Sequence, residues 1–499
     1  MSNSSSNNKL ALLNHGFVSY AREIGRQLTL RVDPKFRMFW DIQKGLTVEA
    51  TPAEQKPLRD VLLPYCPKML QKGPLDEPRR IIDLADVEGR SSIILLDENG
   101  ADRIVAEIGS TRVDFGDSDL VFCRLEPYLG KVLLNDPLQQ WIGTSEWIPL
   151  RVDRNRVLPI FLKWLLLSPQ FLNHGTFWKL RAGKRHARVS ERDLGSIYLP
   201  IPPISVQRVL EPKLFELEGL LTEKHRQLRT RAEVIDETLA TELGYQRSEF
   251  CVSDGPTAYF REASHIGKSL DLRSGVRFLR PEFDRMQDLF KSMDCGRLRD
   301  LIDPIRSRLG ATITPDSYDE EGECLYISPD VIKGYQIDAG AATTVSQAFY
   351  DDNCKTSALR RNDLIISRSG IGIGKVAIYE EDRAAIFSDF TMRIRFNNRI
   401  DPFFGYCVCC SSLFQSQIKK HKRGAAVPNF FPIQMREFWF PCPQKSEQLA
   451  ISERVGAALG AMDLQRVELG NVREEIDGAI REAVIGNLSR RLPVPVAPS

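Results

Sequence analysis

The chain has 499 residues and a mass of 56.6 kDa, which exceeds what one hydrophobic core supports and indicates about two to four domains. Charged residues make up 27% and hydrophobic residues 42%, so this is the composition of a globular rather than a disordered protein. The 68 lysines and arginines almost balance 66 acidic residues, so any nucleic-acid-binding role must rest on local clusters of cations.

Several classes of protein are disfavoured by particular segments. The apolar run Ile160–Leu167 is much shorter than the roughly 20 residues of a membrane helix and contains Lys163. The start, Met1–Asn8, is rich in Ser and Asn with no apolar segment behind it, so we expect no secretory signal. Ten cysteines are too few for a disulfide framework and indicate a reducing compartment. We expect a cytoplasmic protein without membrane association.

The sequence repeats itself once. The segments Asp119–Leu134 and Asp363–Ile378 share an aspartate, a leucine, an arginine, a glycine, a lysine and a valine, where composition alone predicts about one identity. Further matches follow in the same order: Leu58–Val61 with Leu298–Leu301, Ser145–Trp147 with Ser388–Phe390, Pro159–Phe161 with Pro402–Phe404, and Leu199–Pro203 with Phe440–Pro443. This order predicts an internal duplication.

Each half begins with short β-like runs, followed by an apolar helix and a Pro-rich break. The predicted helices are Leu158–Leu167 and Phe403–Phe414. The predicted strands are Arg80–Leu84, Ser92–Leu96, Asp119–Phe122, Lys131–Leu134, Leu325–Ile327, Leu364–Ser367, Lys375–Tyr379 and Met392–Phe396. Mixed strands and helices in both halves predict an α+β fold.

Each half then closes with a long helix. Val206–Leu243 and Glu447–Asn487 have apolar residues at steps of three, four and seven, as along a coiled-coil seam. The first helix should stop at Gly244 and the second near Gly486, because glycine commonly follows a helix C-terminus. A helix of ~38 residues is ~57 Å long, more than one globular region needs for cover. We expect the two helices to pack together.

A globular region, a Pro-rich break and a long helix follow one another twice along the chain. This arrangement resembles the specificity subunit of type I restriction-modification systems. The segments that carry the resemblance are Asp363–Val376, Gly424–Phe430, Phe440–Pro443 and Ser446–Gln448, within a likeness that extends from Leu58 to Leu488. It implies two target recognition domains, each followed by a long helix, and an antiparallel coiled coil between the helices. The first half departs from the family pattern at Leu125–Leu129 and at Gly183–Ser190.

The repeat and the resemblance together predict the domain boundaries. We expect an N-terminal tail at 1–30, a first target recognition domain at 31–203, a first spacer helix at 204–245, a linker at 246–276, a second target recognition domain at 277–444, a second spacer helix at 445–488 and a C-terminal tail at 489–499.

Clustered cations are the candidate DNA-binding residues, because contacts to phosphate supply much of the affinity of DNA-binding proteins. One run of cations alone is equally typical of a solvated surface, but two runs at equivalent repeat positions favour DNA. They are Lys179, Arg181, Lys184, Arg185 and Arg188 in the first half, and Lys419, Lys420, Lys422 and Arg423 in the second. A further set flanks the repeated turn: Arg124, Lys131, Arg368 and Lys375.

Two motifs have competing interpretations. The glycines at 370, 372 and 374 match neither a P-loop nor a dinucleotide fingerprint, and a tight β-turn is at least as good an interpretation as direct DNA contact. Cys407, Cys409 and Cys410 lack a second Cys/His pair at zinc-like spacing, which favours a buried apolar helix over a metal site. We identify no catalytic, cofactor-binding or metal-binding residues.

The predicted function is therefore non-catalytic recognition of a bipartite DNA sequence. By resemblance, the partners are double-stranded DNA, two methyltransferase subunits docked on the long helices, and an endonuclease/translocase subunit. S-adenosylmethionine, ATP and Mg would bind to those partners, not to this chain. The alternatives are an autonomous DNA-binding regulator and a coiled-coil adaptor without a role on DNA.

Overall fold

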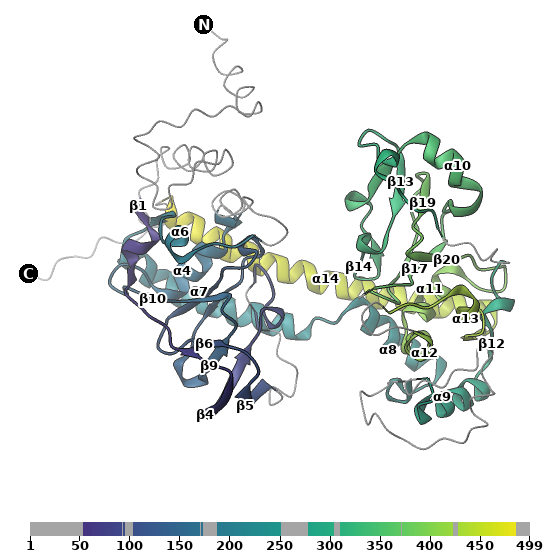
Figure 1. Cartoon of the computed structure of the whole chain (residues 1–499), viewed down its shortest axis with the longest axis horizontal. Coiled ribbons are helices and arrows are strands. Elements are labelled where there is room, and N and C mark those ends of the chain that lie inside the picture. Colours follow the sequence, from purple (N-terminus) through teal and green to yellow (C-terminus); the bar gives the residue numbers. More distant parts are fainter. Residues whose placement is uncertain are drawn as a thin grey trace, which may run out of the picture. The chain divides into compact units, whose positions relative to one another are not determined.

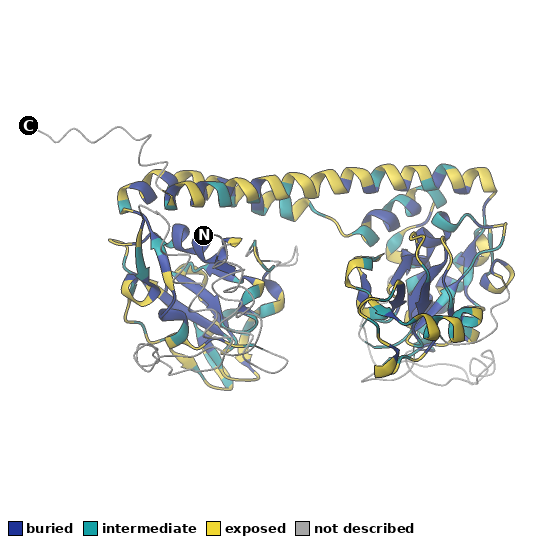
Figure 2. Ribbon diagram, turned by 90° about the horizontal axis from the view of Figure 1, so that it is seen from above, coloured by how far each residue is buried: buried dark blue, intermediate teal, exposed yellow. Residues whose placement is uncertain are grey.

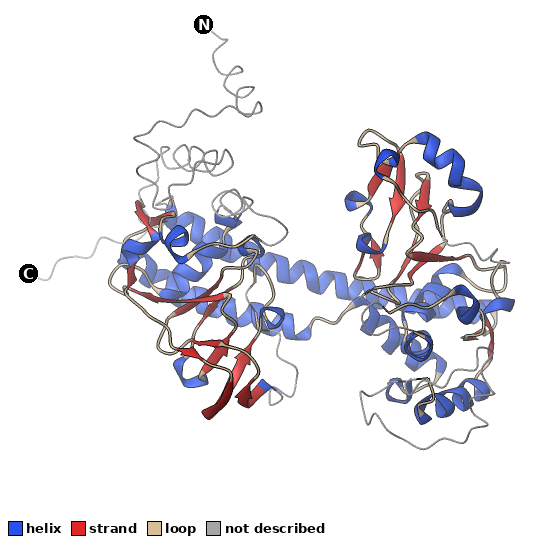
Figure 3. Ribbon diagram, viewed as in Figure 1, coloured by secondary structure: helices blue, strands red, loops and turns tan. Residues whose placement is uncertain are grey.

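The computed structural model describes residues 53–91, 93–94, 103–169, 171–172, 187–250, 278–303, 310–370, 372–422 and 428–485. The chain forms two compact units. Unit 1 comprises Met1–Gln227 and Val467–Ser499, and unit 2 comprises Leu228–Arg466. Each unit combines helices with strands (Figures 1 and 3), so the predicted α+β class is confirmed.

Unit 1 contains a two-stranded sheet (β1-β11), a four-stranded sheet (β2-β10-β7-β8) and a five-stranded sheet (β3-β6-β9-β4-β5). The strands are β1 (Glu54–Pro57), β2 (Leu62–Leu63), β3 (Met69–Leu70), β4 (Gly73–Ile82), β5 (Ile104–Ile108), β6 (Arg112–Asp114), β7 (Leu120–Cys123), β8 (Val132–Leu134), β9 (Trp141–Gly143), β10 (Trp147–Val152) and β11 (Tyr198–Ile201). The helices are α4 (Pro159–Leu167), α6 (Glu191–Gly195) and α7 (Ile204–Gln227), with 3₁₀ turns η1 (Leu58–Val61), η2 (Leu84–Asp86), η4 (Pro127–Leu129) and η5 (Pro137–Gln139).

Unit 2 contains sheets of the orders β12-β21, β16-β13-β19, β14-β15 and β18-β17-β20. The strands are β12 (Cys295–Arg297), β13 (Cys324–Ile327), β14 (Ile332–Lys333), β15 (Gln336–Ile337), β16 (Thr343–Val345), β17 (Leu364–Ser367), β18 (Val376–Ile378), β19 (Ala385–Phe387), β20 (Thr391–Ile394) and β21 (Trp439–Pro441). The helices are α8 (Arg231–Leu243), α9 (Pro281–Ser292), α10 (Gln347–Ser357), α11 (Pro402–Cys410), α12 (Ser412–His421) and α13 (Pro432–Met435). The 3₁₀ turns are η7 (Arg247–Phe250), η9 (Leu298–Asp300), η10 (Pro315–Ser317), η11 (Pro329–Val331) and η12 (Ala339–Ala341).

A strand with two antiparallel neighbours occurs in both units. In unit 1, β7 lies between β10 and β8, and in unit 2, β17 lies between β20 and β18. Cys123 and Ser367 occupy equivalent positions in the repeat. Cys123 pairs with Trp147 and Ser367 pairs with Thr391, so Trp147 corresponds to Thr391 and not to Phe390. The sequence match of Ser145–Trp147 with Ser388–Phe390 is therefore wrong by one residue, because it aligns similar side chains without regard to the backbone register.

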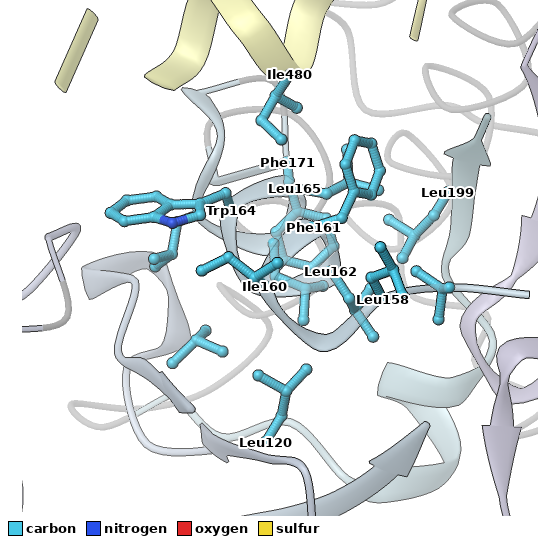
Figure 4. Packing of buried hydrophobic residues seen from close by; sticks show 14 of the residues in the cluster. Leu120, Leu158, Ile160, Phe161, Leu162, Trp164, Leu165, Phe171, Leu199 and Ile480 are labelled. Carbon is cyan, nitrogen blue, oxygen red and sulfur yellow. The ribbon is translucent and has the colours of Figure 1, made fainter. Parts of the chain in front are cut away.

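The core of unit 1 forms around α4. This helix is apolar on nearly all sides, which is typical of a helix enclosed by other elements, and residues 160–167 are all buried. Figure 4 shows Ile480 of the long C-terminal helix α14 (Lys445–Val484) over Trp164 and its neighbours, with Leu199 from β11 at one side. One apolar helix thus joins the sheets of unit 1 to α14.

The only charged residue of α4, Lys163, is 3% exposed and is neutralised by a partner. Its Nζ lies 2.8 Å from Oε1 of Glu218 on α7, whose Oε2 accepts a hydrogen bond from the indole of Trp164 at 3.0 Å. A buried charge is tolerated when it is paired and hydrogen-bonded. This pairing explains how Lys163 can lie inside an apolar run.

Within unit 1, α7 and the C-terminal half of α14 pack side by side. Leu214 and Leu217 of α7 share a hydrophobic cluster with Ile476 of α14. Lys213 pairs with Glu475 and Lys224 with Glu468, both at 2.7 Å, so the helices run in opposite directions. Buried and exposed residues alternate along α14 in Figure 2.

In the residues described, no helix has both the length and the apolar character that a membrane crossing requires.

The first long helix is not continuous, so this part of the prediction is wrong. It ends at Gln227, and α8 begins at Arg231 after an extended Thr230. Thr230 and Glu233 form a capping box, in which the hydroxyl accepts a hydrogen bond from the Glu233 amide and the carboxylate accepts one from the Thr230 amide. The predicted stop at Gly244 is confirmed, with φ +69°. The second long helix is confirmed over Lys445–Val484.

The predicted helix Phe403–Phe414 is also two helices. Ser411 separates α11 from α12 and has extended backbone angles, with its hydroxyl donating to the Val408 carbonyl at 2.7 Å. The cysteines at 407, 409 and 410 are buried in α11, which confirms the prediction of a buried apolar helix there.

Most predicted strands coincide with observed ones to within a few residues at each end. Arg80–Leu84 is the exception in length, because β4 begins earlier, at Gly73. Ser92–Leu96 lies mostly outside the described residues.

The capping box gives a first testable prediction. Thr230→Ala removes the acceptor for the Glu233 amide and should lower the free energy of unfolding of unit 2 by about 1 kcal/mol. Urea denaturation followed by circular dichroism would measure this. Thr241→Ala is the control, because Thr241 is an exposed position inside the same helix. Equal stability of the two variants would contradict a stabilising role for the cap.

Candidate nucleic-acid interface

In unit 1, the end of β7 is joined to residues 187–189, which include Arg188, the last cation of the first run. The carbonyl of Arg124 accepts a hydrogen bond from the Val189 amide at 3.1 Å, and the Glu126 amide donates to the Ala187 carbonyl at 2.8 Å. Between these bonds, Leu125 and Arg188 form an antiparallel bridge. Arg124 and Arg188, which are far apart in the sequence, are therefore neighbours.

Unit 2 repeats these contacts at the end of β17. The carbonyl of Arg368 accepts from the Phe430 amide, and the Gly370 amide donates to the Pro428 carbonyl, both at 3.1 Å. Ser369 and Asn429 form the antiparallel bridge. In each unit, the turn after the central strand is thus hydrogen-bonded to a segment that lies at or shortly after a run of cations in the sequence.

The arginines of unit 1 are paired with acidic residues. The guanidinium of Arg188 forms hydrogen bonds of 2.9–3.0 Å with both carboxylate oxygens of Glu146, which raises the pKa of Arg188. The Nη2 of Arg124 lies 3.1 Å from the Glu191 carboxylate. The pair of Arg124 with Glu191 is partly exposed to solvent and such ion pairs are worth little, so an anionic ligand could replace Glu191 at low cost, whereas the bidentate pair of Arg188 with Glu146 is stronger.

Arg368 of unit 2 has a different environment. Its Nε donates to the carbonyl of Asp389 at 2.6 Å, and its guanidinium carbon lies 5.8 Å from the centre of the Phe431 ring. Phe431 is an exposed aromatic residue at the start of α13. A planar cation beside an exposed ring is a combination suited to contacts with phosphate and with bases.

The lysines at the repeated turn also differ between the units. Lys375 is exposed on the turn between β17 and β18, where Gly370 and Gly374 have φ of +82° and +87°. These angles favour glycine and make the glycine-rich segment a tight turn between strands, as the structural interpretation predicted. Lys131 is half-buried and donates to the Leu84 carbonyl at 2.6 Å, so its ammonium is engaged within the protein.

The second run of cations lies at the C-terminal end of α12. Lys419 is exposed, whereas Lys420 lies over the rings of Phe278 and Phe283, at 5.1 and 5.6 Å from their centres. Cations in the last turn of a helix also interact favourably with the helix dipole. Lys419 is consequently better placed than Lys420 to reach an external anion.

Several predicted residues lie outside the part of the chain that the structure describes. They are Lys179, Arg181, Lys184, Arg185 and Arg423. Lys422, which follows α12, is described and is half-buried.

The sequence reasoning missed the acidic and aromatic partners of these cations. Glu146 comes from the turn before β10, Glu191 from the first residue of α6, and Phe431 from the residue before α13. Glu191 is visible in the sequence as the one acid close to the first run. For Glu146 and Phe431, only the folded chain brings them beside Arg188 and Arg368.

The cysteine-rich part of α11 does not have the chemistry of a metal site. Cys407 and Cys409 are fully buried, and burial raises the pKa of both thiols well above their ordinary value. Metals bind the thiolate, which burial in apolar surroundings disfavours. Among the described residues, no group of three His, Cys, Asp or Glu side chains is arranged to hold a metal ion.

No protein-family model matches this sequence, and no curated protein does. The chain is similar to a solved structure described as "Structural basis underlying complex assembly and conformational transition of the type I R-M system", at 16% identity, covering 88% of this chain and 99% of that one, with a TM-score of 0.42. It is similar to the HsdS subunit from Thermoanaerobacter tengcongensis (16% identity, 87% and 97% covered, TM-score 0.31). The S subunit of a type I restriction-modification system from M. genitalium gives 11% identity, 87% and 97% covered, and a TM-score of 0.34.

The ion pairs of unit 1 give a second prediction. Glu146→Gln frees Arg188, so binding to a non-specific DNA duplex should tighten, and the slope of log affinity against log salt should steepen by up to about 0.9. Fluorescence anisotropy over a range of KCl concentrations measures this slope. Glu216→Gln, at an exposed position of α7, changes the net charge equally and should leave the slope unchanged. An unchanged slope for Glu146→Gln would mean that Arg188 does not reach DNA.

Proposed function

We propose that this chain is the sequence-specific DNA-recognition subunit of a cytoplasmic restriction-modification complex and that it reads a bipartite target. The observation that supports the proposal is the contact that recurs in both units, between the turn after the central strand and the segment 187–189 in unit 1 or 428–430 in unit 2. In each unit this segment follows or ends a run of cations in the sequence.

Each unit would read one half of the target. Cations such as Arg188 and Lys419 would contact phosphates and set the register on the duplex, since phosphate contacts position a protein without reading sequence. Side chains on the adjoining turns, including Phe431, would contact bases in the grooves. The two units would then be copies of one target recognition domain with different groove-facing residues, which would explain why their side chains diverge while the hydrogen bonds recur.

The long helices would act as the spacer between the two half-sites. The antiparallel packing of α7 with α14 in unit 1 supports an antiparallel coiled coil as the form of this spacer. Val209 and Phe215 of α7 and Leu464 and Val467 of α14 are at least half exposed, although apolar. Single exposed apolar residues are ordinary on a protein surface, so the docking assignment rests on the family resemblance: the long helices would bind two methyltransferase subunits.

Catalysis would take place in the partner subunits. An adenine methyltransferase would bring S-adenosylmethionine, and an endonuclease/translocase would bring ATP and Mg. The groups assembled at the surface described above are guanidinium, ammonium and aromatic side chains, whose chemistry suits binding to an anionic polymer.

The source cell provides the most direct test. Methylome sequencing should find a modified adenine in a split motif, and deleting this chain should remove that modification while other methylated motifs remain. A cell that expresses the partner subunits but has no split methylated motif would contradict the proposal. Tight binding of the isolated chain to its site, with no effect on methylation, would instead indicate an autonomous regulator.

The cations of unit 2 allow a biochemical test. Replacing Lys419, Lys420, Lys422 and Arg423 with Gln should weaken binding to every duplex, and the salt slope should fall by about 0.9 for each phosphate that the variant no longer neutralises. The control is Lys291→Gln, which removes a charge from the exposed face of α9. An unchanged slope would mean that the cluster is only a solvated surface. A changed sequence preference at constant slope would overturn the phosphate role in favour of base contacts.

A further inference from the structure

A fully buried glutamine lies in the first turn of α7. Gln207 is the fourth residue of that helix and is 0% exposed. Its Oε1 accepts a hydrogen bond from the Leu158 amide at 2.9 Å. Its Nε2 donates to the carbonyls of Arg156 at 3.1 Å and Pro202 at 2.8 Å. One side chain therefore satisfies three backbone groups from two separate segments.

The same arrangement recurs at the start of α14. Gln448 is likewise the fourth residue of its helix and is 0% exposed. Its Oε1 accepts from the Asp401 amide at 2.7 Å, and its Nε2 donates to the carbonyls of Arg399 at 2.9 Å and Pro443 at 2.8 Å. The two sets correspond bond for bond, although α7 and α14 differ in length and surroundings.

The three bonded groups belong to the parts of each unit that meet the long helix. Leu158 and Asp401 are the N-cap residues of the apolar helices α4 and α11. Arg156 and Arg399 lie in the loops before those helices, and Pro202 or Pro443 lies in the Pro-rich break. Each glutamine thus ties the first turn of a long helix to the break and to the start of the core helix.

Glutamine is well matched to this position, because its amide offers two donors and one acceptor group at a fixed angle. Glutamate would lose both donors, and methionine, of similar shape, would lose every bond and leave three buried backbone groups unpaired. Unpaired buried groups are costly, so the bonds hold the helix in one orientation.

We propose that Gln448 is a positioning residue that sets the direction in which α14 leaves unit 2, and thereby the spacing at which the two half-sites are read, whereas its counterpart Gln207 holds α7, which stays within unit 1. This inference rests on the proposed DNA-recognition function. α14, with 40 residues, is ~60 Å long. A tilt of ~5° at its start displaces the far end by ~5 Å, which exceeds the ~3.4 Å between base pairs. A small change in the direction of the helix would therefore change the distance between the two half-sites that the chain binds.

The test uses the full chain assembled with its methyltransferase subunits and duplexes that carry the split motif. One set of duplexes has the natural spacer, and two others have it shortened or lengthened by one base pair. The wild type should bind the natural spacer at least about tenfold more tightly, since mismatched sites typically cost that much. Gln448→Met should reduce this preference to less than about threefold, whereas Gln207→Met, which affects a helix that stays within unit 1, should leave the preference unchanged.

Gln417→Met is the matched control. Gln417 is also a buried glutamine, and it bonds to the amide and carbonyl of Trp439 and to the carbonyl of Leu413, but these bonds tie α12 to β21 and involve neither long helix. This variant should lose a similar amount of stability and keep the wild-type spacer preference. If all three variants keep the wild-type preference, or all three lose it equally, the positioning role is overturned.

Two further measurements separate the possible failures. If the wild type binds no split motif, the proposed function fails, and small-angle X-ray scattering then tests the helix setting alone. Gln448→Met should broaden the distribution of interatomic distances, whereas Gln207→Met and Gln417→Met should not, and an unbroadened distribution for Gln448→Met overturns the inference. If Gln448→Met does not fold, Gln448→Asn, which keeps an uncharged amide on a shorter side chain, replaces it in both measurements.

Discussion

The burial of one face of α14 is the interaction on which both units depend. Leu459 and Met462 belong to the core of unit 2, and Ile476 and Ile480 belong to the core of unit 1. Removing this face would expose the apolar surface of α4 in one unit and of α8 in the other. Each buried aliphatic side chain is worth about 1.5–3 kcal/mol, so a helix that contributes several to each core is essential to both.

The ion pairs inside the cores differ in solvent exposure from those at the surface. Buried ion pairs are close: Lys163 with Glu218, and Arg395 with Asp363, whose carboxylate is 1% exposed. At the candidate interface, Arg188 and Arg124 are paired with Glu146 and Glu191 in partly exposed positions. The buried pairs are costly to break, whereas the exposed pair of Arg124 with Glu191 is weak. The near-zero net charge therefore coexists with a surface cation that is only weakly neutralised.

The candidate site shows where prediction from sequence succeeds and where it stops. The repeat locates the central strands, the turns after them and the runs of cations, because each is a local pattern of residue types. It does not indicate that Arg188 adjoins Arg124, since that contact depends on a backbone bridge between residues far apart in the chain. The role of the buried glutamines is not evident from the sequence, although both end the same local pattern, Pro-x-x-Ser-x-Gln, at Pro202–Gln207 and Pro443–Gln448.

The sequence by itself determined the α+β class, the position of α14, the burial of the cysteines in α11 and the stop at Gly244, because periodicity and composition act locally. It also contained the capping box at Thr230 and Glu233, although the strong apolar periodicity on both sides concealed it. Only the tertiary structure decided that α7 and α8 are separate helices in different cores, and which acids neutralise which arginines. Pairing between distant residues depends on the path of the backbone, and a linear pattern of residue types does not contain that information.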